Sequence, residues 1–439
     1  MSPSVTLPER WSIKTLGEVC SLVSGAGFPL EYQNQKGEEF PFFKVANLAE
    51  VRAGESLRWS NHTISASDAK TLGAKIIPAG ATVFAKIGMA IRLNRRRQVA
   101  QASCIDNNMM AAIPKSDIID GRYLLRFLET VDLIQFVHTT TVPAVRKSDL
   151  ERISVPVPPL AEQRLITVTV DSLLAACSDS ADHLQAGQQA IQRFRQTILA
   201  DAASGRLTSD WRDQGTDVAS VARVDLQSAA KRSRKVASAI ENFTSNELQE
   251  IPDSWRWVPL GAVSDSVLGK MLDQAKNRGD FRPYLRNLNV RWRTFDLSDV
   301  LEMRFEADED QRYGIRAGDV MVCEGGEPGR AAVWRESTST MHFQKALHRV
   351  RCHDLLLPDW LMNVLQAHAS SGLLTRYFTG TGIKHLTGIS LARVPIPLPP
   401  VAEQLELVQI VDSLWLQADR VVERLNVFHP DLGVPSHMA

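Results

Sequence analysis

The string VPVPPLAEQ at Val155–Gln163 returns as IPLPPVAEQ at Ile396–Gln404, 241 residues further along the chain. A second string, VDSL at Val170–Leu173, returns at the same offset as Val411–Leu414. An offset that stays constant while the intervening sequence diverges indicates two copies of one structural unit. The chain is therefore predicted to contain two domains of the same fold that carry different surfaces.

The composition is that of a folded protein without a membrane segment. Of the 439 residues, 44% are hydrophobic and 23% are charged, and no apolar run approaches the roughly 20 residues that a membrane span needs. The first residues lack the basic and apolar segments of a secretory signal, and the five cysteines are scattered without a CxxC pair. We expect a protein of the reducing cytoplasm, with neither a disulfide framework nor a thiolate zinc site.

Each copy begins with a β-rich part and also contains helices. The segments at residues 41–48, 71–88 and 313–326 alternate short apolar runs with glycine and proline turns, which is typical of strands. Gly121–Val137 and Pro358–Leu374 carry apolar residues at the helical spacing of three and four. Each globular part is therefore predicted to be mixed α and β.

A long helix is predicted to follow each copy of the repeated motif. Pro159 and Pro400 suit the first turn of a helix, where a missing N–H is tolerated, and Glu162 and Glu403 place negative charge near the positive end of the helix dipole. Downstream, a heptad stripe in the same register in both helices predicts that they pack on each other, although each stripe could instead pack on its own domain. The seam positions are Ile166, Val170, Leu173, Cys177, Leu184, Ile191 and Phe194 in the first helix and Leu407, Val411, Leu414, Val421 and Leu425 in the second.

This arrangement resembles the specificity subunits of type I restriction-modification enzymes. The strings LPERWSIKTLGEV and IPDSWRWVPLGAV look like the openings of two target-recognition domains, and PVPPLAEQ and PLPPVAEQ look like the start of each conserved helix. The resemblance implies an α+β fold in which two similar mixed α/β target-recognition domains are separated by long conserved helices. It also implies that these helices form an antiparallel coiled coil, giving a pseudo-twofold internal repeat.

The predicted boundaries follow from the repeat and the resemblance. The first target-recognition domain covers residues 1–156, the central conserved helix 157–204, a connector 205–250, the second target-recognition domain 251–397, the C-terminal conserved helix 398–429 and a tail 430–439. Within the connector, Val218–Ile240 is predicted to form one basic amphipathic helix. The continuation of the first helix, Gln192–Thr208, has no counterpart after the second, which predicts a shortened spacer or an altered subunit contact.

No sequence motif for catalysis is present. The chain lacks the Asn/Asp-Pro-Pro-aromatic motif and glycine-rich cofactor loop of an adenine methyltransferase, and it lacks a GxxxxGK[ST] phosphate loop. The histidines lack HExxH spacing, so no metal site is predicted. The resemblance implies a non-catalytic subunit that binds double-stranded DNA and two methyltransferase (modification) subunits, with restriction or translocase subunits as a further partner. S-adenosylmethionine, ATP and Mg²⁺ are then expected in those partners and not in this chain.

DNA recognition needs cations for phosphates and Arg, Asn or Gln for base edges, presented on loops. Basic side chains gather in two segments, Arg92–Arg97 and Lys270–Asp296, although either could be an ordinary solvated loop. Thr140 and Thr381 lie in small-residue loops that precede the conserved helix of their own copy, and these loops could approach a phosphate or simply form a turn. The candidates for DNA binding are Lys44, Asn47, Lys86, Arg92, Arg95, Arg96, Arg97, Asn107, Asn108 and Thr140 in the first copy and Arg286, Asn289, Arg291, Arg293, Arg330, Gln344, Lys345, Thr381 and Lys384 in the second. Lys44 with Arg286 and Asn47 with Asn289 occupy matching places, which favours them.

Two other functions fit the same pattern. A duplicated scaffold would assemble proteins without touching DNA, and an equivalent specificity subunit could serve another phage-defence methylation system. The basic clusters argue against the scaffold, and salt-dependent binding to duplex DNA would separate the two functions.

Overall fold

The first and last strands of each copy pair with each other. The computed structural model describes residues 7–52, 54–137, 142–214, 224–245, 248–273, 277–337 and 340–427. Strand β1 (Ser12–Thr15) runs antiparallel to β10 (Ser154–Val157), and β11 (Arg256–Pro259) runs antiparallel to β19 (Pro395–Leu398). The motif that repeats in the sequence thus closes each globular part and leads directly into a helix.

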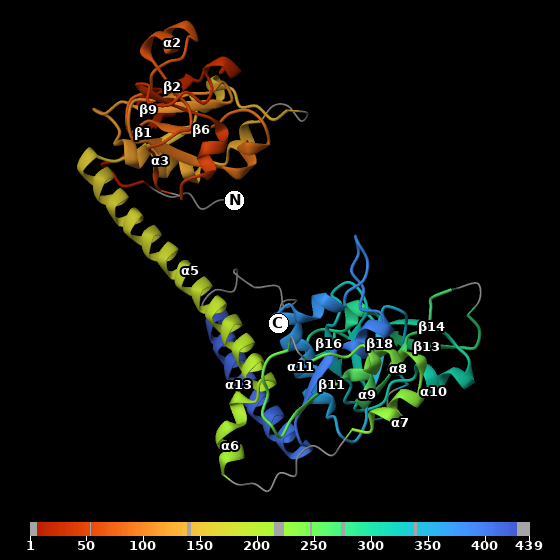
Figure 1. Ribbon diagram of the computed structural model, residues 1–439. Helices are drawn as coiled ribbons and strands as arrows, with labels where there is room; N and C mark the ends of the chain where they lie inside the picture. Colours follow the sequence, from red (N-terminus) through yellow and green to blue (C-terminus); the bar gives the residue numbers. More distant parts are fainter. Residues whose placement is uncertain are drawn as a thin grey trace. The chain divides into compact units, whose positions relative to one another are not determined.

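The chain divides into two compact units, residues 1–182 and 183–439 (Figure 1). The division falls inside helix α5 (Leu160–Ala203), which has 44 residues and is about 66 Å long at 1.5 Å per residue. The sequence-based boundaries set this helix apart as a segment of its own, whereas in the structure each unit includes one part of it.

Besides the β1–β10 pair, the described residues of unit 1 form two larger sheets. A five-stranded sheet has the order β2-β9-β6-β7-β4, and a three-stranded sheet has the order β5-β3-β8, in which β3 and β8 are parallel. Helix α3 packs on β6, β7 and β9. The strands are β2 (Cys20–Ser24), β3 (Phe40–Phe43), β4 (Ser56–Leu57), β5 (Thr63–Ile64), β6 (Thr82–Ala85), β7 (Arg96–Val99), β8 (Cys104–Ile105) and β9 (Met109–Pro114). The helices are α1 (Leu16–Val19), α2 (Ala66–Thr71), α3 (Gly121–Thr130) and α4 (Lys147–Leu150), with 3₁₀ turns η1 (Leu30–Tyr32), η2 (Val45–Ala49), η3 (Met89–Leu93) and η4 (Leu133–Phe136).

Unit 2 repeats this topology. Its four-stranded sheet has the order β12-β18-β15-β16, and its three-stranded sheet has the order β14-β13-β17 with β13 parallel to β17. Helix α11 packs on β15 and β16 as α3 does on its own sheet. The strands are β12 (Ser264–Leu268), β13 (Asp280–Leu285), β14 (Leu301–Phe305), β15 (Val320–Cys323), β16 (Ala331–Val333), β17 (His342–Phe343) and β18 (Leu347–Cys352). The helices are α6 (Ser209–Asp213), α7 (Leu226–Lys231), α8 (Arg234–Glu241), α9 (Leu260–Val263), α10 (Asp310–Tyr313), α11 (Pro358–Ser370), α12 (Gly388–Arg393) and α13 (Val401–Val427), with η5 (Arg206–Thr208), η6 (Asn287–Asn289), η7 (Ala307–Glu309) and η8 (Leu373–Tyr377).

The glutamine that ends the repeated motif joins each long helix to its globular part. Gln163 is fully buried, its Nε2 donates to the carbonyls of Ile118 (3.0 Å) and Pro158 (2.8 Å), and its Oε1 accepts from the backbone N of Asp120 (2.7 Å). Asp120 is the N-cap of α3, so one amide links the start of α5 to the helix that covers the sheet. The same three bonds recur in unit 2, where the partners of Gln404 are the carbonyls of Leu355 and Pro399 and the backbone N of Leu357.

A tryptophan–glutamate pair lies beside each glutamine. The Nε1 of Trp11 donates to Oε1 of Glu162 at 3.1 Å, and the Nε1 of Trp255 donates to Oε2 of Glu403 at 2.8 Å. The tryptophan directly precedes the first strand of each copy, β1 or β11, and the glutamate comes from the first turn of the long helix. The carboxylate therefore has a second function besides its favourable interaction with the helix dipole.

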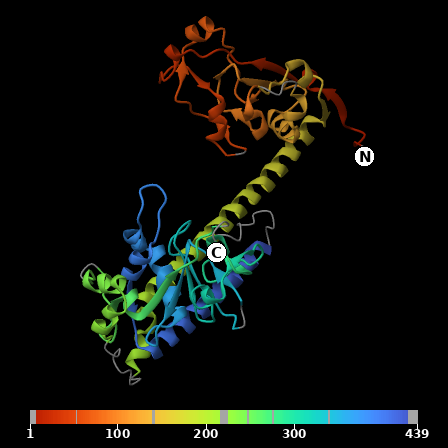
Figure 2. The same cartoon turned by 90° about the vertical axis from the view of Figure 1, so that its right-hand side faces the viewer.

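Helices α5 and α13 pack antiparallel within unit 2 (Figures 1 and 2). Thr208, after the end of α5, donates to Glu403 at the start of α13 (2.7 Å), whereas Arg195 pairs with Asp419 further along α13. Between these contacts, Ile198 and Leu199 share a buried apolar core with Leu407 and Val411. The predicted packing of one helix on the other is thus observed.

Four seam positions were predicted wrongly. Leu173, which is 62% exposed, and Cys177 lie on the part of α5 that belongs to unit 1, and they are exposed to solvent. Phe194 and Val421 are exposed as well. In both helices the next residue on the buried face lies four positions after the preceding heptad position, whereas the heptad pattern assumed a spacing of three. The residues that take their places are the buried Arg195 and the half-buried Val422.

The remaining seam positions lie on buried or half-buried faces. Leu407 and Val411 are fully buried. In unit 1, Ile166 packs against the core of the globular part. The half-buried ones are Ile166, Val170, Leu184, Ile191, Leu414 and Leu425.

The connector does not form the single predicted helix. Residues 226–241 fold into α7 and α8, which are interrupted at Ser233, whose Oγ accepts from the backbone N of Val236 (3.2 Å) and caps α8. Arg232 donates to the carbonyls of Gly261 (2.9 Å) and Ala262 (2.6 Å). These bonds anchor the connector to α9, so it is part of unit 2. Residues 218–223 of the predicted helix lie outside the described residues.

In the part of the chain that the structure describes, no helix is both long and apolar enough to cross a membrane.

We predict that Gln404→Ala destabilises unit 2 by about 2–4 kcal/mol, because the substitution leaves a buried N–H and two buried carbonyls unpaired. Urea denaturation of the full chain measures the loss. Gln163→Ala should destabilise unit 1 by a similar amount. The matched control is Gln409→Ala on the exposed face of α13, which should change the free energy of unfolding by less than about 0.5 kcal/mol. An equal effect of Gln404→Ala and Gln409→Ala would contradict the anchoring role.

Candidate nucleic-acid interface

Four loops meet at one end of the sheets in unit 1. The backbone N of Lys86, after β6, donates to the carbonyl of Asn108 at 2.8 Å, and the carbonyl of Lys86 accepts from Val145 at 2.9 Å. The backbone N of Asp106, after β8, donates to the carbonyl of Phe43, at the end of β3, at 3.0 Å. These bonds hold the loops after β3, β6 and β8 and the loop before α4 in one frame, which we call the loop frame.

Unit 2 builds the same loop frame. The backbone N of Glu324 donates to the carbonyl of Ala346 (2.8 Å), and the carbonyl of Glu324 accepts from the backbone N of Leu386 (2.8 Å). The backbone N of Gln344 donates to the carbonyl of Leu285 (3.1 Å). The backbone is therefore repeated bond for bond. The side chains are not, since Lys86 is replaced by Glu324, Asp106 by Gln344 and Asn108 by Ala346. A constant backbone with exchanged side chains is what two readers of different sequences require.

The loop frame of unit 1 presents cations and amides. Lys44 is half-buried and its Nζ donates to Oε1 of Gln33 at 3.0 Å. Burial lowers the pKa of Lys86, and the carboxylate of Asp106 opposes this shift. Burial likewise raises the pKa of Asp106, although it accepts a bond from the backbone N of Asn108 (3.0 Å). A partly desolvated ammonium gains from a bound phosphate, since little water has to be displaced.

The other polar residues predicted for this loop frame remain accessible. Asn107 is exposed and Asn108 is half-buried. Arg92, in η3, is exposed, and Arg95 is half-buried. Thr140 lies outside the described residues.

The paired asparagines are structural. Oδ1 of Asn47 accepts from the backbone N of Lys44 (2.7 Å), and Oδ1 of Asn289 accepts from the backbone N of Arg286 (2.9 Å). Nδ2 of Asn47 donates to Oε2 of Glu50 (3.0 Å). Both asparagines are buried, so their amides shape the turn after β3 or β13. The prediction that they read bases is corrected to this role.

Arg96 and Arg97 are also buried and bind the protein itself. Nη2 of Arg96 donates to the carbonyl of Val131 (2.9 Å), and Nη2 of Arg97 donates to the carbonyl of Val51 (3.0 Å). Burial lowers the pKa of Arg96 to about 10. Both residues lie in β7, inside the sheet, so they cannot reach DNA from this position.

The arginines predicted for unit 2 are held by internal acceptors. Arg286 donates to Asp299 (2.6 Å), Arg291 to Asp296 (3.4 Å) and Arg330 to Glu327 (2.8 Å). These three are half-buried, and they lie close enough to solvent to exchange a carboxylate for a phosphate.

Arg293 is different, because it binds helix α13. It pairs with Asp412, donates to Oδ1 of Asn363 (2.5 Å) and lies 4.6 Å from the ring centre of Trp415. Burial lowers its pKa, with Asp412 acting in the opposite direction. Its prediction as a DNA ligand is corrected to a role in holding α13.

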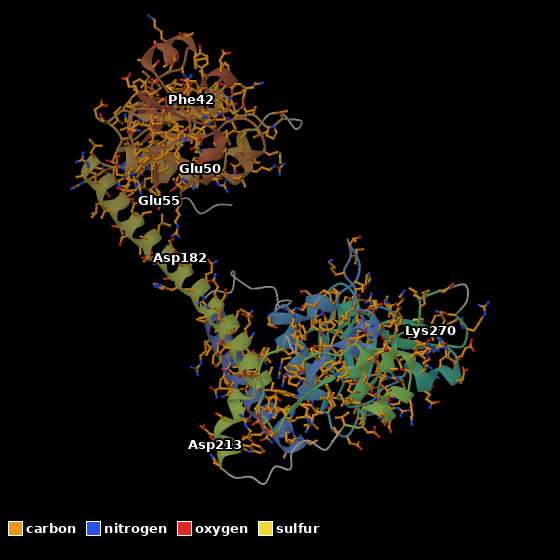
Figure 3. The ribbon with its side chains drawn as sticks, in the orientation of Figure 1. Phe42, Glu50, Glu55, Asp182, Asp213 and Lys270 are labelled. Carbon is orange, nitrogen blue, oxygen red and sulfur yellow. The ribbon has the colours of Figure 1, made fainter. Side chains whose placement is uncertain are left out.

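The remaining candidates of unit 2 surround its loop frame. Lys345, Thr381 and Lys384 are exposed, and Gln344 is half-buried. Lys270, at the start of the predicted basic segment, is buried instead, and its Nζ donates to Glu309 (2.5 Å) and to the carbonyl of Arg304 (3.0 Å; Figure 3). Among the described residues, no group of three or more His, Cys, Asp or Glu side chains is placed to hold a metal.

Comparison with known proteins identifies this architecture. Residues 8–186, which cover the globular part of unit 1, match the family model of the type I restriction modification DNA specificity domain. This part of the chain is therefore similar to the DNA specificity domain of type I restriction-modification enzymes. The resemblance found in the two repeated motifs is therefore confirmed.

Individual relatives agree with this family. The EcoDI specificity subunit of Escherichia coli is 25% identical over 65% of this chain, and the alignment spans 60% of that subunit's length. The EcoBI specificity subunit of Escherichia coli is 22% identical over 96% of this chain and 83% of its own length.

Solved structures confirm the predicted fold class. A chain from a structure on complex assembly and conformational transition of the type I R-M system has a TM-score of 0.66 at 19% identity, covering 97% of this chain and 95% of its own length. The HsdS subunit from Thermoanaerobacter tengcongensis has a TM-score of 0.53 at 19% identity, covering 99% of this chain and 95% of its own length.

Sequence reasoning missed the exposed aliphatic residues Val142 and Ile383, which lie beside the loop frames. The repeat offset of 241 residues aligns the two positions exactly as it aligns the motifs, so the signal was present in the sequence.

We predict that Asn289→Ala lowers the stability of unit 2 by about 2–3 kcal/mol, because three hydrogen bonds of a fully buried amide are lost. Thermal and urea unfolding of the full chain measure this. Asn107→Ala, at an exposed position of the loop frame in unit 1, should leave stability unchanged. A stable Asn289→Ala chain with weaker DNA binding would restore the discarded prediction that this residue reads bases.

Proposed function

We propose that this chain is the sequence-specific DNA-binding subunit of a type I restriction-modification system. Each unit reads one half of a bipartite target through its loop frame. The observation that carries the proposal is the repeated backbone of the loop frame with exchanged side chains, in a chain similar to specificity subunits.

Contacts to DNA divide between the two kinds of side chain on the loop frames. The exposed cations Arg92, Lys345 and Lys384 bind phosphates and fix the position of the duplex. Asn107, Asn108 and Gln344 offer paired donors and acceptors to adenine N6 and N7, and Lys86, Arg286 and Arg330 suit guanine O6 and N7. Each good base contact contributes about 1–3 kcal/mol of discrimination, so a few in each unit are enough for a short half-site.

The chain has no catalytic role in this proposal. It directs two modification subunits, one for each copy of the repeated motif and helix start, because equivalent surfaces present equivalent binding sites. Those subunits hold S-adenosylmethionine, and restriction or translocase subunits, where present, hold ATP and Mg²⁺.

The first test is to exchange residues Trp255–Val394 for the same segment of another specificity subunit, together with the cognate modification subunits. Mapping of methylated adenines should show one half-site changed and the other unchanged, because each loop frame is built entirely within its own unit. A change in both half-sites would contradict reading by independent units. Absence of any salt-dependent DNA binding by the assembled complex would instead favour a protein scaffold.

Helix α5 is the continuous connection between the units, so we expect its length to determine the gap between half-sites. Deletion of the heptad Ser180–Ala186 should change the permitted gap and preserve both half-site sequences, as measured by methylation mapping. As a control, Ser180→Ala and Gln185→Ala, at exposed positions of the same heptad, should leave the gap unchanged. An unaltered gap after the deletion would show that α5 does not set it.

A further inference from the structure

Residues 379–385 form a closed hairpin in unit 2. The backbones of Thr379 and His385 exchange two hydrogen bonds, at 2.8 and 2.9 Å, and Nζ of Lys384 donates to the carbonyl of Gly380 at 2.9 Å. Gly380 has a φ of +97°, and a Cβ there would lie 2.3 Å from the carbonyl oxygen of Ile383. Only glycine closes this turn, so the tip has a defined shape.

The hairpin exposes an apolar side chain where a polar one would be expected. Ile383 is 74% exposed, and its neighbours Gly382, Lys384 and His385 are exposed as well. Burial of an isoleucine side chain is favourable, so the side chain is suited to a buried contact that this chain does not itself supply.

The hairpin is fixed to the loop frame of unit 2. The residue after it, Leu386, donates to the carbonyl of Glu324 at 2.8 Å, and a Cβ at Gly325 would lie 3.3 Å from Nδ1 of His385. In Figures 1 and 2 the segment projects as a blue loop from the body of unit 2. The base of the hairpin is therefore attached to the loop frame of unit 2, and Ile383 lies within the projecting part.

Unit 1 places an equivalent side chain beside its own loop frame. Val142 lies 241 residues before Ile383, is 55% exposed, and is followed by Pro143, whose carbonyl accepts from Gly88 at 2.8 Å. Val145 then donates to the carbonyl of Lys86 as Leu386 does to Glu324. Both units thus present a β-branched aliphatic residue at the same place, although the residues around it differ.

We propose that Ile383 and Val142 are apolar wedges that enter a base step of duplex DNA and partly unstack it, one in each half-site. The inference rests on the proposed function. Cations next to both side chains favour DNA as the occupant, since Lys384 follows Ile383 directly and Arg146 is exposed four residues after Val142. Minor-groove and architectural DNA-binding proteins insert apolar side chains, isoleucine among them, between base steps, and the kink brings more protein surface onto the duplex.

The test uses the full chain with its modification subunits and duplexes that carry 2-aminopurine at successive positions of the mapped target. Binding should raise the fluorescence several-fold at one step of each half-site. Ile383→Ala should abolish the rise in the half-site of unit 2 only and weaken DNA binding about tenfold, and Val142→Ala should do the same in the other half-site. Ile383→Leu should keep the signal, because leucine preserves the apolar volume.

The matched control is Ile389→Ala, since Ile389 is 54% exposed on α12 but does not lie in the hairpin. This variant should bind and unstack DNA as the parent does. Folding of every variant is checked by thermal unfolding, and recruitment of the modification subunits by sedimentation.

The outcomes separate the wedge from the proposed function. Specific binding without a fluorescence rise at any step would overturn the wedge and leave the proposed function intact. Weaker binding by Ile383→Ala with an unchanged signal would assign the residue to a thymine methyl contact and overturn the wedge. Loss of the modification subunits, with DNA binding unaffected, would assign Ile383 to a protein contact and also overturn it. No salt-dependent DNA binding by the parent complex would reject the proposed function itself.

Discussion

The buried amide of the repeated motif is the contact on which the rest of the structure depends. Gln163 and Gln404 each satisfy a backbone N–H and two carbonyls where the last strand of a unit turns into a long helix. Backbone polar groups at such a junction are costly to leave unpaired, and a single glutamine pairs three of them. The helix therefore starts in a defined direction from its sheet. This explains why both copies of the motif end in glutamine while the recognition surfaces diverge.

The architecture could be predicted from sequence periodicity and repetition, because both patterns follow local rules. The repeated strings identify two copies of one fold, and the proline, glutamate and heptad signals identify the two helices. The prediction of the seam was wrong at Phe194 and Val421. There the spacing between successive positions of the buried face is four residues instead of three, and a strict heptad pattern does not allow for this change. The connector failed at Ser233, because the short helices α7 and α8 are stabilised by tertiary contacts with α9 that no local pattern contains.

The candidate recognition residues were harder to predict, because residue type does not state exposure. Asn47 and Asn289 were favoured as DNA-binding residues because they occupy matching positions in both copies. A residue that two domains with different targets share is more readily explained by their common fold than by recognition of a DNA sequence. Both amides cap the same turn. In contrast, Lys86 and Glu324 occupy one backbone position with opposite charges, so divergence within a constant backbone is the better indicator of specificity. Arg96 and Arg97 were misassigned because a run of basic residues can also belong to a strand whose guanidinium groups bind backbone carbonyls.

The buried Arg195 fixes the register between helices α5 and α13. Its guanidinium pairs with Asp419 and lies 5.0 Å from the centre of the Trp415 ring. If α13 slid along α5 by one heptad, the apolar residues could still find apolar partners, but this cation would lose its carboxylate inside a desolvated contact. An uncompensated buried charge is strongly destabilising, by about 3–5 kcal/mol, so such slippage is selected against. Arg195 therefore fixes the register of α13 on α5. Insertions or deletions elsewhere in α5 can then change the length of that helix without changing this register.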